Sequence, residues 1–164
     1  MNKSAVTQVE KLEISVTVST EKIKPSKSVR NLGATLDTHL SMESHIANTT
    51  RNVYYHLRRI QKIRCHLDIE TCRNIVHSCV TSRLDYHNGL LTGASEKALH
   101  RLQLVQNNAA HVITGTKPHI RPVLHTLHWL PIKERIAFKV LLFVHMALHN
   151  SYAPEYLKDL VSIY

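Results

Sequence analysis

Apolar side chains recur every three or four residues from position 42 to position 60, and this spacing constrains the fold more than any other feature. An α-helix makes one turn in about 3.6 residues, so residues at this spacing share one side of a helix. The stripe consists of Met42, Ile46, Thr49, Val53, Leu57 and Ile60. Ser41 is expected to cap this helix, and the helix is expected to run to about Arg64.

Later cap and stop signals predict further helices. Asp68 is expected to begin one that ends near Tyr86, with an inward face of Ile69, Cys72, Val76, Cys79 and Val80. Ser95 is expected to begin the next, which stops at Gly115 and has an inward face of Leu99, Leu102, Val105, Ala109 and Val112. A short helical turn at 123–127, a helix from Pro131 to Leu148 and a last helix at 155–161 complete the expectation.

The first 40 residues carry the pattern of strands. Leu12, Ile14, Val16 and Val18 alternate with polar residues, as in a half-buried strand. The range 29–36 reads as a second strand, in which Gly33 indicates a bulge or a close backbone approach. The sequence therefore predicts a mainly α fold, with a short β-hairpin-like element at 1–40 and a bundle of about five helices at 41–164.

The charge of the chain favours a polyanionic partner. Lys and Arg total 21 against 12 acidic residues, which gives a net charge of +9. Such a balance suits RNA, DNA or an acidic membrane surface. A row of basic residues lies on the side of the 41–64 helix opposite its apolar stripe, and it includes an aromatic residue on which a base could stack. This row is a candidate nucleic-acid site. An ordinary solvated helix face would have the same composition. The row consists of Arg51, Tyr55, Arg58, Arg59 and Lys62.

Histidines and cysteines are the candidate metal ligands. The chain has 13 histidines, and its cysteines stand at positions 65, 72 and 79. Zinc requires three or four converging ligands, usually from two short-spaced pairs, and no second pair stands at a suitable spacing. We therefore expect no metal site and interpret the cysteines as core residues. Their odd number and the lack of a Cys-x-x-Cys pair favour a reducing compartment.

The motifs of catalysis are missing from the sequence. It has no Gly-x-Ser-x-Gly elbow, no phosphate-binding glycine loop and no paired aspartates, so we expect no catalytic residue, cofactor or small-molecule substrate. The longest apolar run, 136–148, contains Lys139 and is shorter than the ~20 residues of a membrane span. We expect an intracellular protein, cytoplasmic or nuclear, that is neither secreted nor membrane-bound. Trp129 is interpreted as a core anchor before the 131–148 helix.

Several sequence blocks, taken together in order, resemble the reverse transcriptases (RNA-directed DNA polymerases) of non-LTR retrotransposons of the LINE type, in particular jockey-like elements. The resemblance extends from about Leu12 to Tyr164. The blocks are 28–46, Val80–Tyr86, Arg101–Asn107, Val112–Gly115, Leu127–Pro131, Arg135-Ile136, Phe138-Lys139 and Ala153–Leu157.

The resemblance implies a position within the parent enzyme. Leu32 and Gly33 would correspond to the primer grip at the end of the palm, so 1–40 would be a palm remnant. The range 41–164 would be the thumb and the helices after it, which hold the template–primer duplex. The fingers and most of the palm, including the paired catalytic aspartates, would precede Met1. The chain departs from the family at His87, where a cysteine is usual, and at Asn150, where a glycine is expected.

We therefore expect a catalytically inert fragment of such a reverse transcriptase. It would retain at most non-specific, salt-sensitive binding of RNA or DNA through Leu32, Gly33 and the basic row. Two alternatives remain open at this point. The chain could be a helical protein–protein interaction module, or a transposon remnant without function.

Overall fold

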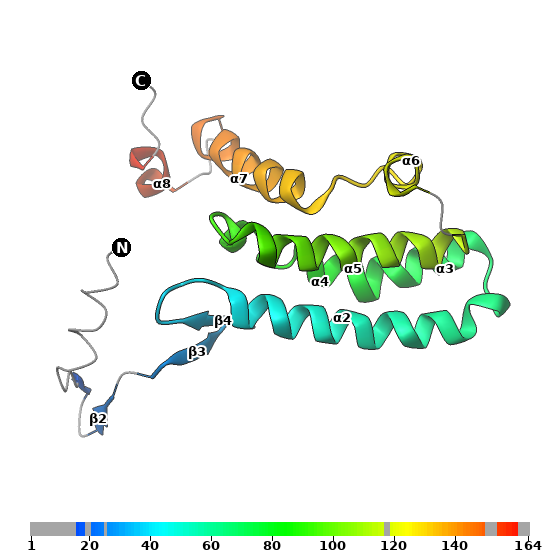
Figure 1. The fold of residues 1–164 in the computed structure, drawn as a ribbon. Helices are drawn as coiled ribbons and strands as arrows, with labels where there is room; N and C mark the ends of the chain where they lie inside the picture. The colour runs from blue at the N-terminus through cyan, green and yellow to red at the C-terminus, as the bar shows by residue number, and fades with distance from the viewer. Residues whose placement is uncertain (1–15, 19–20, 25, 117–118, 150–153, 161–164) are drawn as a thin grey trace.

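Two short β-hairpins precede a bundle of helices (Figure 1). The computed structural model describes residues 16–18, 21–24, 26–116, 119–149 and 154–160. Strands β1 (Val16–Val18) and β2 (Glu21–Ile23) pair antiparallel, as do β3 (Ser28–Asn31) and β4 (Ala34–Asp37). The expected mainly α fold with an N-terminal hairpin element is therefore confirmed.

Helix α2 (Glu43–Ile63) is the amphipathic helix that the sequence predicts. Of its apolar stripe, only Thr49 is less than fully buried. Ser41 is not the N-cap, which was a wrong prediction. The cap position is held by Met42, in the left-handed conformation with φ of 59°, and the Ser41 hydroxyl instead accepts a 3.3 Å hydrogen bond from the backbone N–H of Glu43. Met42 is buried in the core, which accounts for its place at a position that usually takes a polar residue.

A second long helix is continuous from position 69 to position 85 but changes its winding midway. It consists of α3 (Ile69–Val76), the π-helical turn η2 (His77–Thr81) and α4 (Ser82–Asp85). The short 3-10 turn η1 (Arg64–His66) connects it to α2. Asp68 caps it as expected, since its carboxylate accepts a 2.8 Å bond from the N–H of Thr71.

The π-helical turn changes which side chains face the core. In a regular α-helix, Leu84 would lie about 120° around the axis from Cys72. The wider turn takes up an additional residue and returns Leu84 to the buried side with Cys72, Val76 and Val80. The expected inward face was wrong at its start, where Ile69 is exposed, and Cys79 is only half-buried.

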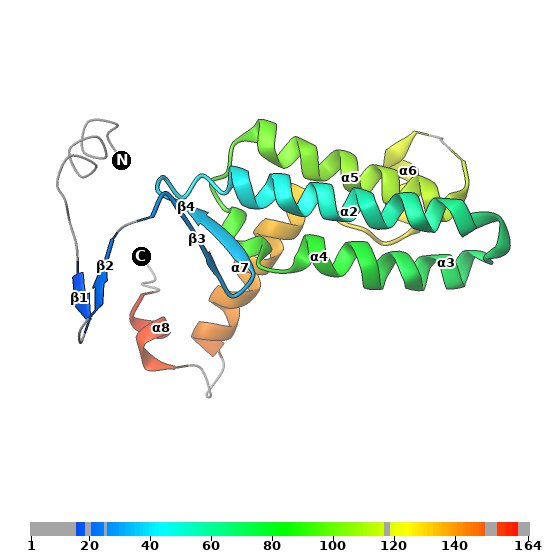
Figure 2. The same ribbon diagram turned by 90° about the horizontal axis from the view of Figure 1, so that it is seen from below.

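Helix α5 (Glu96–Thr114) lies at the centre of the bundle. Its expected ends are confirmed, because the Ser95 hydroxyl accepts a bond from the N–H of Ala98 and Gly115 ends the helix with φ of 69°. Figure 2 shows α2 lying alongside both α5 and the α3–α4 helix. The residues of α5 that are at most 2% exposed are Ala98, Leu102, Val105, Gln106, Ala109, Ala110 and Ile113.

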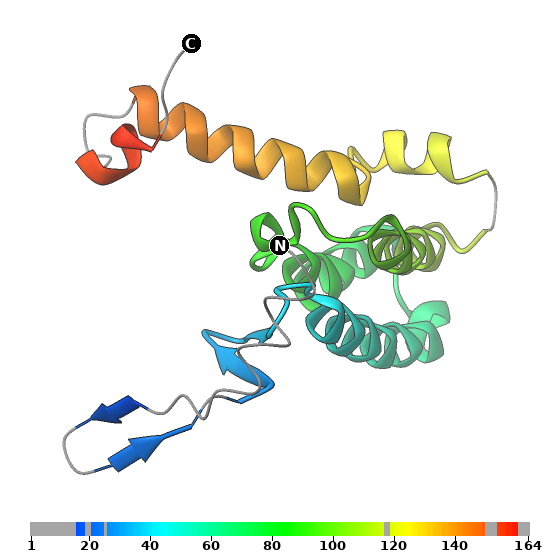
Figure 3. The same cartoon turned by 60° about the vertical axis from the view of Figure 1, so that its left-hand side comes forward.

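The last helices cover the other side of α5. The chain passes from α4 through the 3-10 turn η3 (Asn88–Leu91) into α5, and then through α6 (Ile120–Thr126) to α7 (Ile132–His149). Helix α8 (Glu155–Asp159) packs on α7. Figure 3 shows α7 crossing over the bundle and continuing past it. The α7 and α8 ranges agree with expectation, whereas Leu12, Ile14 and Asn150 lie outside the described residues.

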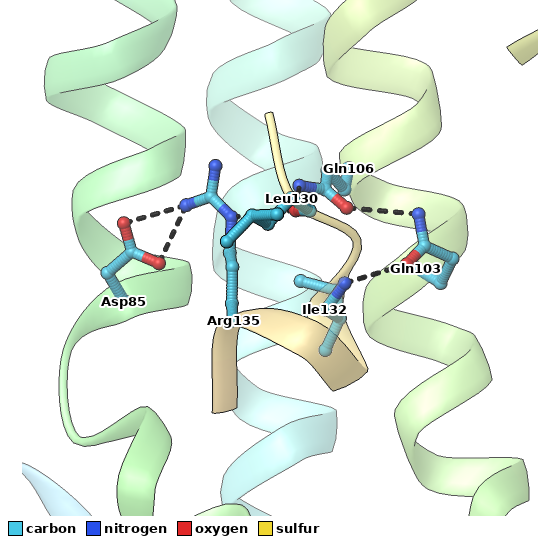
Figure 4. Close-up of polar contacts among 6 residues, drawn as sticks. All are labelled: Asp85, Gln103, Gln106, Leu130, Ile132 and Arg135. Carbon is cyan, nitrogen blue, oxygen red and sulfur yellow. Dashed lines mark hydrogen bonds and ion pairs between the residues drawn. The ribbon is translucent and has the colours of Figure 1, made fainter. Parts of the chain in front are cut away.

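Two glutamine amides fix the start of α7 on α5 (Figure 4). Gln106 donates from Nε2 to the carbonyl of Leu130 at 2.8 Å, and the Oε1 of Gln103 accepts from the N–H of Ile132 at 2.9 Å. The two amides also bond each other, at 3.0 Å. Gln106 is 1% exposed, so its hydrogen bonds avoid the cost of a buried unpaired amide.

An ion pair ties α7 to the end of α4. Arg135 places Nη1 2.7 and 2.8 Å from the two carboxylate oxygens of Asp85 and donates from Nε to the Leu130 carbonyl. Its guanidinium carbon lies 5.9 Å from the ring centre of Trp129. Trp129 packs against the core just before α7, in agreement with the anchor interpretation.

Arg64 joins the end of α5 to the connection between α2 and α3 through one guanidinium. It donates to the carbonyl oxygens of Val112 and Ile113 in the last turn of α5 and to that of Leu67, each at 2.8 Å. The last carbonyls of a helix have no partner within the helix, so a cation there supplies both hydrogen bonds and a favourable charge.

Replacing Arg64 by methionine should lower the free energy of unfolding by about 2 kcal/mol, because three partly buried carbonyls lose a charged donor. Urea unfolding followed by circular dichroism measures the change. Arg73→Met, at an exposed position of α3, serves as the control and should change stability by less than about 0.5 kcal/mol. Equal losses in the two variants would contradict a bridging role for Arg64.

Candidate nucleic-acid interface

The side of α2 that faces away from the core carries the basic row. All five members are exposed on this one helix, so the structure brings them together as expected. At helical spacing they lie opposite the buried stripe of α2, a helix that Figure 1 shows at the edge of the bundle. The row consists of Arg51, Tyr55, Arg58, Arg59 and Lys62. Among the described residues, none of these cations forms a salt bridge with a carboxylate.

Local contacts hold two of the arginines in place. Arg59 donates to the hydroxyl of Tyr55 at 3.3 Å, and its guanidinium carbon lies 5.5 Å from the centre of the Tyr55 ring. Arg51 bonds the side-chain oxygen of Asn48 at 3.4 Å. Tyr55 is 56% exposed. It therefore supports the orientation of Arg59 and also presents aromatic surface to solvent.

Arg83 of α4 is a further basic residue near α2, which the sequence analysis missed. His56 is half-buried, and its pKa is lowered by burial and then by the positive charges of Arg83 and Arg59. The guanidinium of Arg83 is held by a 2.7 Å bond to the carbonyl of Cys79. Arg83 therefore lies near His56, on the side of α2 that packs against α4.

Leu32 and Gly33 form the two-residue turn between β3 and β4. Both have positive φ, 46° and 86°, as a tight hairpin turn of the I′ type requires. The expectation of one strand with a bulge was wrong, and it is a side chain, the ring of Tyr86, that approaches Gly33 closely. A Cβ atom on Gly33 would lie 3.3 Å from Cε1 of Tyr86. Leu32 is 78% exposed in a conformation that is unfavourable for leucine.

Tyr86 and His45 hold this hairpin on the bundle. The Tyr86 hydroxyl donates to the carbonyl of Leu32 at 2.7 Å, and His87 stacks on the Tyr86 ring with 3.9 Å between ring centres. On the α2 side, the N–H of Thr35 donates to Nδ1 of His45 at 3.4 Å. His45 is buried, and its pKa is lowered by burial and then by the proximity of His87.

Asp37 organises the connection from β4 to α2. Its Oδ1 accepts from the N–H groups of His39 and Ser41, and its Oδ2 accepts from the Ser41 hydroxyl at 2.8 Å. Burial raises the pKa of the Asp37 carboxyl, but the hydrogen bonds from Ser41 and His39 together outweigh it and lower the pKa. Leu40 and Met42 both have positive φ here, so the connection is held against local backbone preference.

The sequence-predicted residues thus fall into two groups. Arg51, Arg58 and Lys62 share the outer face of α2, whereas Leu32 and Gly33 are fixed through the end of α4. β4 also packs on α2, which keeps the hairpin beside the N-terminal part of that helix (Figure 2). The contact that fixes the turn joins residues 54 positions apart. No local pattern in the sequence could have indicated it.

The cysteines and histidines of the described ranges do not form a metal site. No group of three or more potential ligands lies together there. Cys72 is buried as a core residue, but Cys65 is exposed, so interpreting all three cysteines as core residues was wrong. As for membranes, none of the helices in the described part of the chain combines the length and apolarity that a span requires.

Comparisons with protein-family models, curated proteins and solved structures found no match.

Replacing Tyr86 by phenylalanine should loosen the hairpin turn without unfolding the bundle. The variant loses one hydrogen bond, which is worth about 1 kcal/mol. Hydrogen exchange of the β3–β4 amides should become about fivefold faster, while the amides of α5 should keep their protection. Tyr156→Phe, at an exposed position of α8, is the matched control. Unchanged exchange in β3–β4 would show that Tyr86 does not hold the turn.

The lowered pKa of His45 predicts acid sensitivity. Because the folded-state pKa lies below the unfolded value of about 6.5, protonation favours unfolding. The stability that neutral His45 contributes is present above that pH and is lost as the pH falls through the folded-state pKa. His45→Gln should therefore reduce the decrease in unfolding free energy between pH 7.5 and 5.5, as measured by urea titration. His125→Gln, at an exposed site, should leave the wild-type pH dependence unchanged.

Proposed function

We propose that this protein binds RNA or DNA through the outer face of α2, without reading base sequence. The observation that carries the proposal is the row of exposed cations along one helix, with no salt bridge to a carboxylate among the described residues. Arg51 and Arg58 are two helical turns apart and Lys62 is one turn further. Their charged groups can therefore follow successive phosphates of a backbone.

The nature of these contacts favours phosphate binding over base recognition. Arginine and lysine bind phosphate oxygens through charge and hydrogen bonds, and such contacts carry no sequence information. Tyr55 adds a ring on which any base can stack. Binding of this kind releases counterions, so the affinity should fall steeply as salt increases.

We further propose that the chain derives from a non-LTR retrotransposon reverse transcriptase and corresponds to the end of the palm and the thumb. The family resemblance supports this origin. The architecture is compatible with it, since a tight turn at Leu32 and Gly33 is followed, after β4, by a helix with a basic outer face. This proposal assigns binding of nucleic acid, and no catalytic step, to these 164 residues.

Removal of two cations from the row should lower the affinity for nucleic acid and also reduce the dependence of that affinity on salt. With four phosphate contacts, the logarithm of the affinity for single strands should fall with a slope of about −3 against the logarithm of salt concentration. Arg58→Gln combined with Lys62→Gln should reduce the slope by about 1.4. Fluorescence anisotropy with a labelled single-stranded RNA, between 50 and 200 mM salt, measures both quantities.

A matched double variant distinguishes the loss of this surface from a general effect of lower net charge. Arg121→Gln with Lys158→Gln removes two positive charges from α6 and α8, away from the α2 row. It should retain a salt dependence close to that of the wild type. Equal effects of the two double variants, or an affinity that does not depend on salt, would rule out the α2 face as the binding site.

A further inference from the structure

The outer face of α7 is apolar and uncovered. Phe138, Leu142 and Met146 are spaced four residues apart with Leu141 beside them, and the exposed fractions of Phe138, Leu141, Leu142 and Met146 are 57%, 65%, 36% and 45%. Figures 1 and 3 show α7 on the side of α5 opposite to α2, so α5 lies between α7 and the helix that carries the basic row. A contiguous exposed apolar surface of this kind is typical of an interaction site.

A pocket of about 290 Å³ lies at the N-terminal end of this face, between the first turns of α7 and the segment after α4. Its apolar wall includes Phe138, Leu142 and Leu130, and its polar wall includes Lys139 and Asn88. The apolar face of α7 therefore continues directly into a hollow that can accept a side chain. The hollow offers a polar partner for the same ligand.

The polar wall carries a positive charge that no protein group neutralises within the described ranges. Arg135 also lines the pocket, but its charge is already paired with Asp85. Lys139, in contrast, has no salt bridge there, and its ammonium lies 5.2 Å from the ring centre of Phe143. The ligand that complements this wall carries a carboxylate or another anion beside an apolar group.

Asn88 lines the pocket, but its side-chain oxygen is enclosed within the protein and is not presented to a ligand. Lys139 is therefore the polar group of this wall that a bound anion would meet.

We propose that the pocket and the apolar face of α7 bind an acidic, apolar peptide segment of a protein partner. Such a segment supplies an apolar side chain for the pocket and a carboxylate for Lys139. Its acidity also complements the net charge of +9 of the chain. A nucleic-acid strand fits less well, because this wall presents one available cation instead of a row. The proposal is independent of nucleic-acid binding by α2.

The test uses three labelled synthetic peptides of twelve residues each. The first combines leucine and phenylalanine with glutamate, the second replaces each glutamate by lysine, and the third replaces each apolar residue by serine. Only the first should bind the full-length protein in fluorescence anisotropy. In ¹H–¹⁵N spectra, its addition should shift the amide signals of η3 and of the 135–146 range. Binding of the second peptide with equal affinity would overturn the proposal.

Charge reversals on the two faces should separate the two activities. Lys139→Glu should weaken binding of the first peptide at least tenfold and leave RNA affinity within twofold of wild type. Lys62→Glu should weaken RNA binding and leave the affinity for the first peptide within twofold of wild type. A loss of RNA binding in Lys139→Glu would instead assign the pocket to nucleic acid, and a concentration-dependent mass that Phe138→Ser abolishes would assign the face to a second copy of the chain. Each of these results would contradict the proposal.

Discussion

The burial of α5 is the constraint on which the arrangement of the molecule depends. This helix packs on α2 and α3 on one side and on α6 and α7 on the other, so it separates the two outer faces. Its apolar residues form the core, while Gln103 and Gln106 bond the backbone at the start of α7. Because buried amides must be paired, this network permits one placement of α7 and keeps that helix on the side of α5 opposite to α2.

Local signals in the sequence predicted most of the helices. The spacing in α2 and the caps Asp68 and Ser95 act within a few residues of chain, so they can be recognised without a structure. The errors have two physical causes. The π-helical turn η2 rotates the buried face, which a fixed period of 3.6 residues does not anticipate. At Ser41, burial of the neighbouring Met42 outweighed the usual preference for a polar cap.

The residues of the candidate site could be predicted from the sequence, but the contacts that hold them in place could not. The cations of α2 stand at helical spacing, so their common face follows from the sequence alone. The placement of Leu32 and Gly33 depends instead on Tyr86 and His45, and the bond from Tyr86 spans more than fifty residues. Arg83 approaches His56 of α2 only because α4 packs beside α2. The uncovered face of α7 likewise becomes evident only when its neighbours are known.

The π-helical turn η2 positions two contacts that lie on different parts of the molecule. Three residues after it, Leu84 begins the segment that also carries Asp85, the partner of Arg135, and Tyr86, the partner of Leu32. Loss of one residue from this turn would rotate the whole segment by about 100°. The hairpin would then lose its bond from Tyr86, and α7 its ion pair with Asp85, in the same step. A single additional residue in one helix thus keeps the register of two surfaces that do not touch each other.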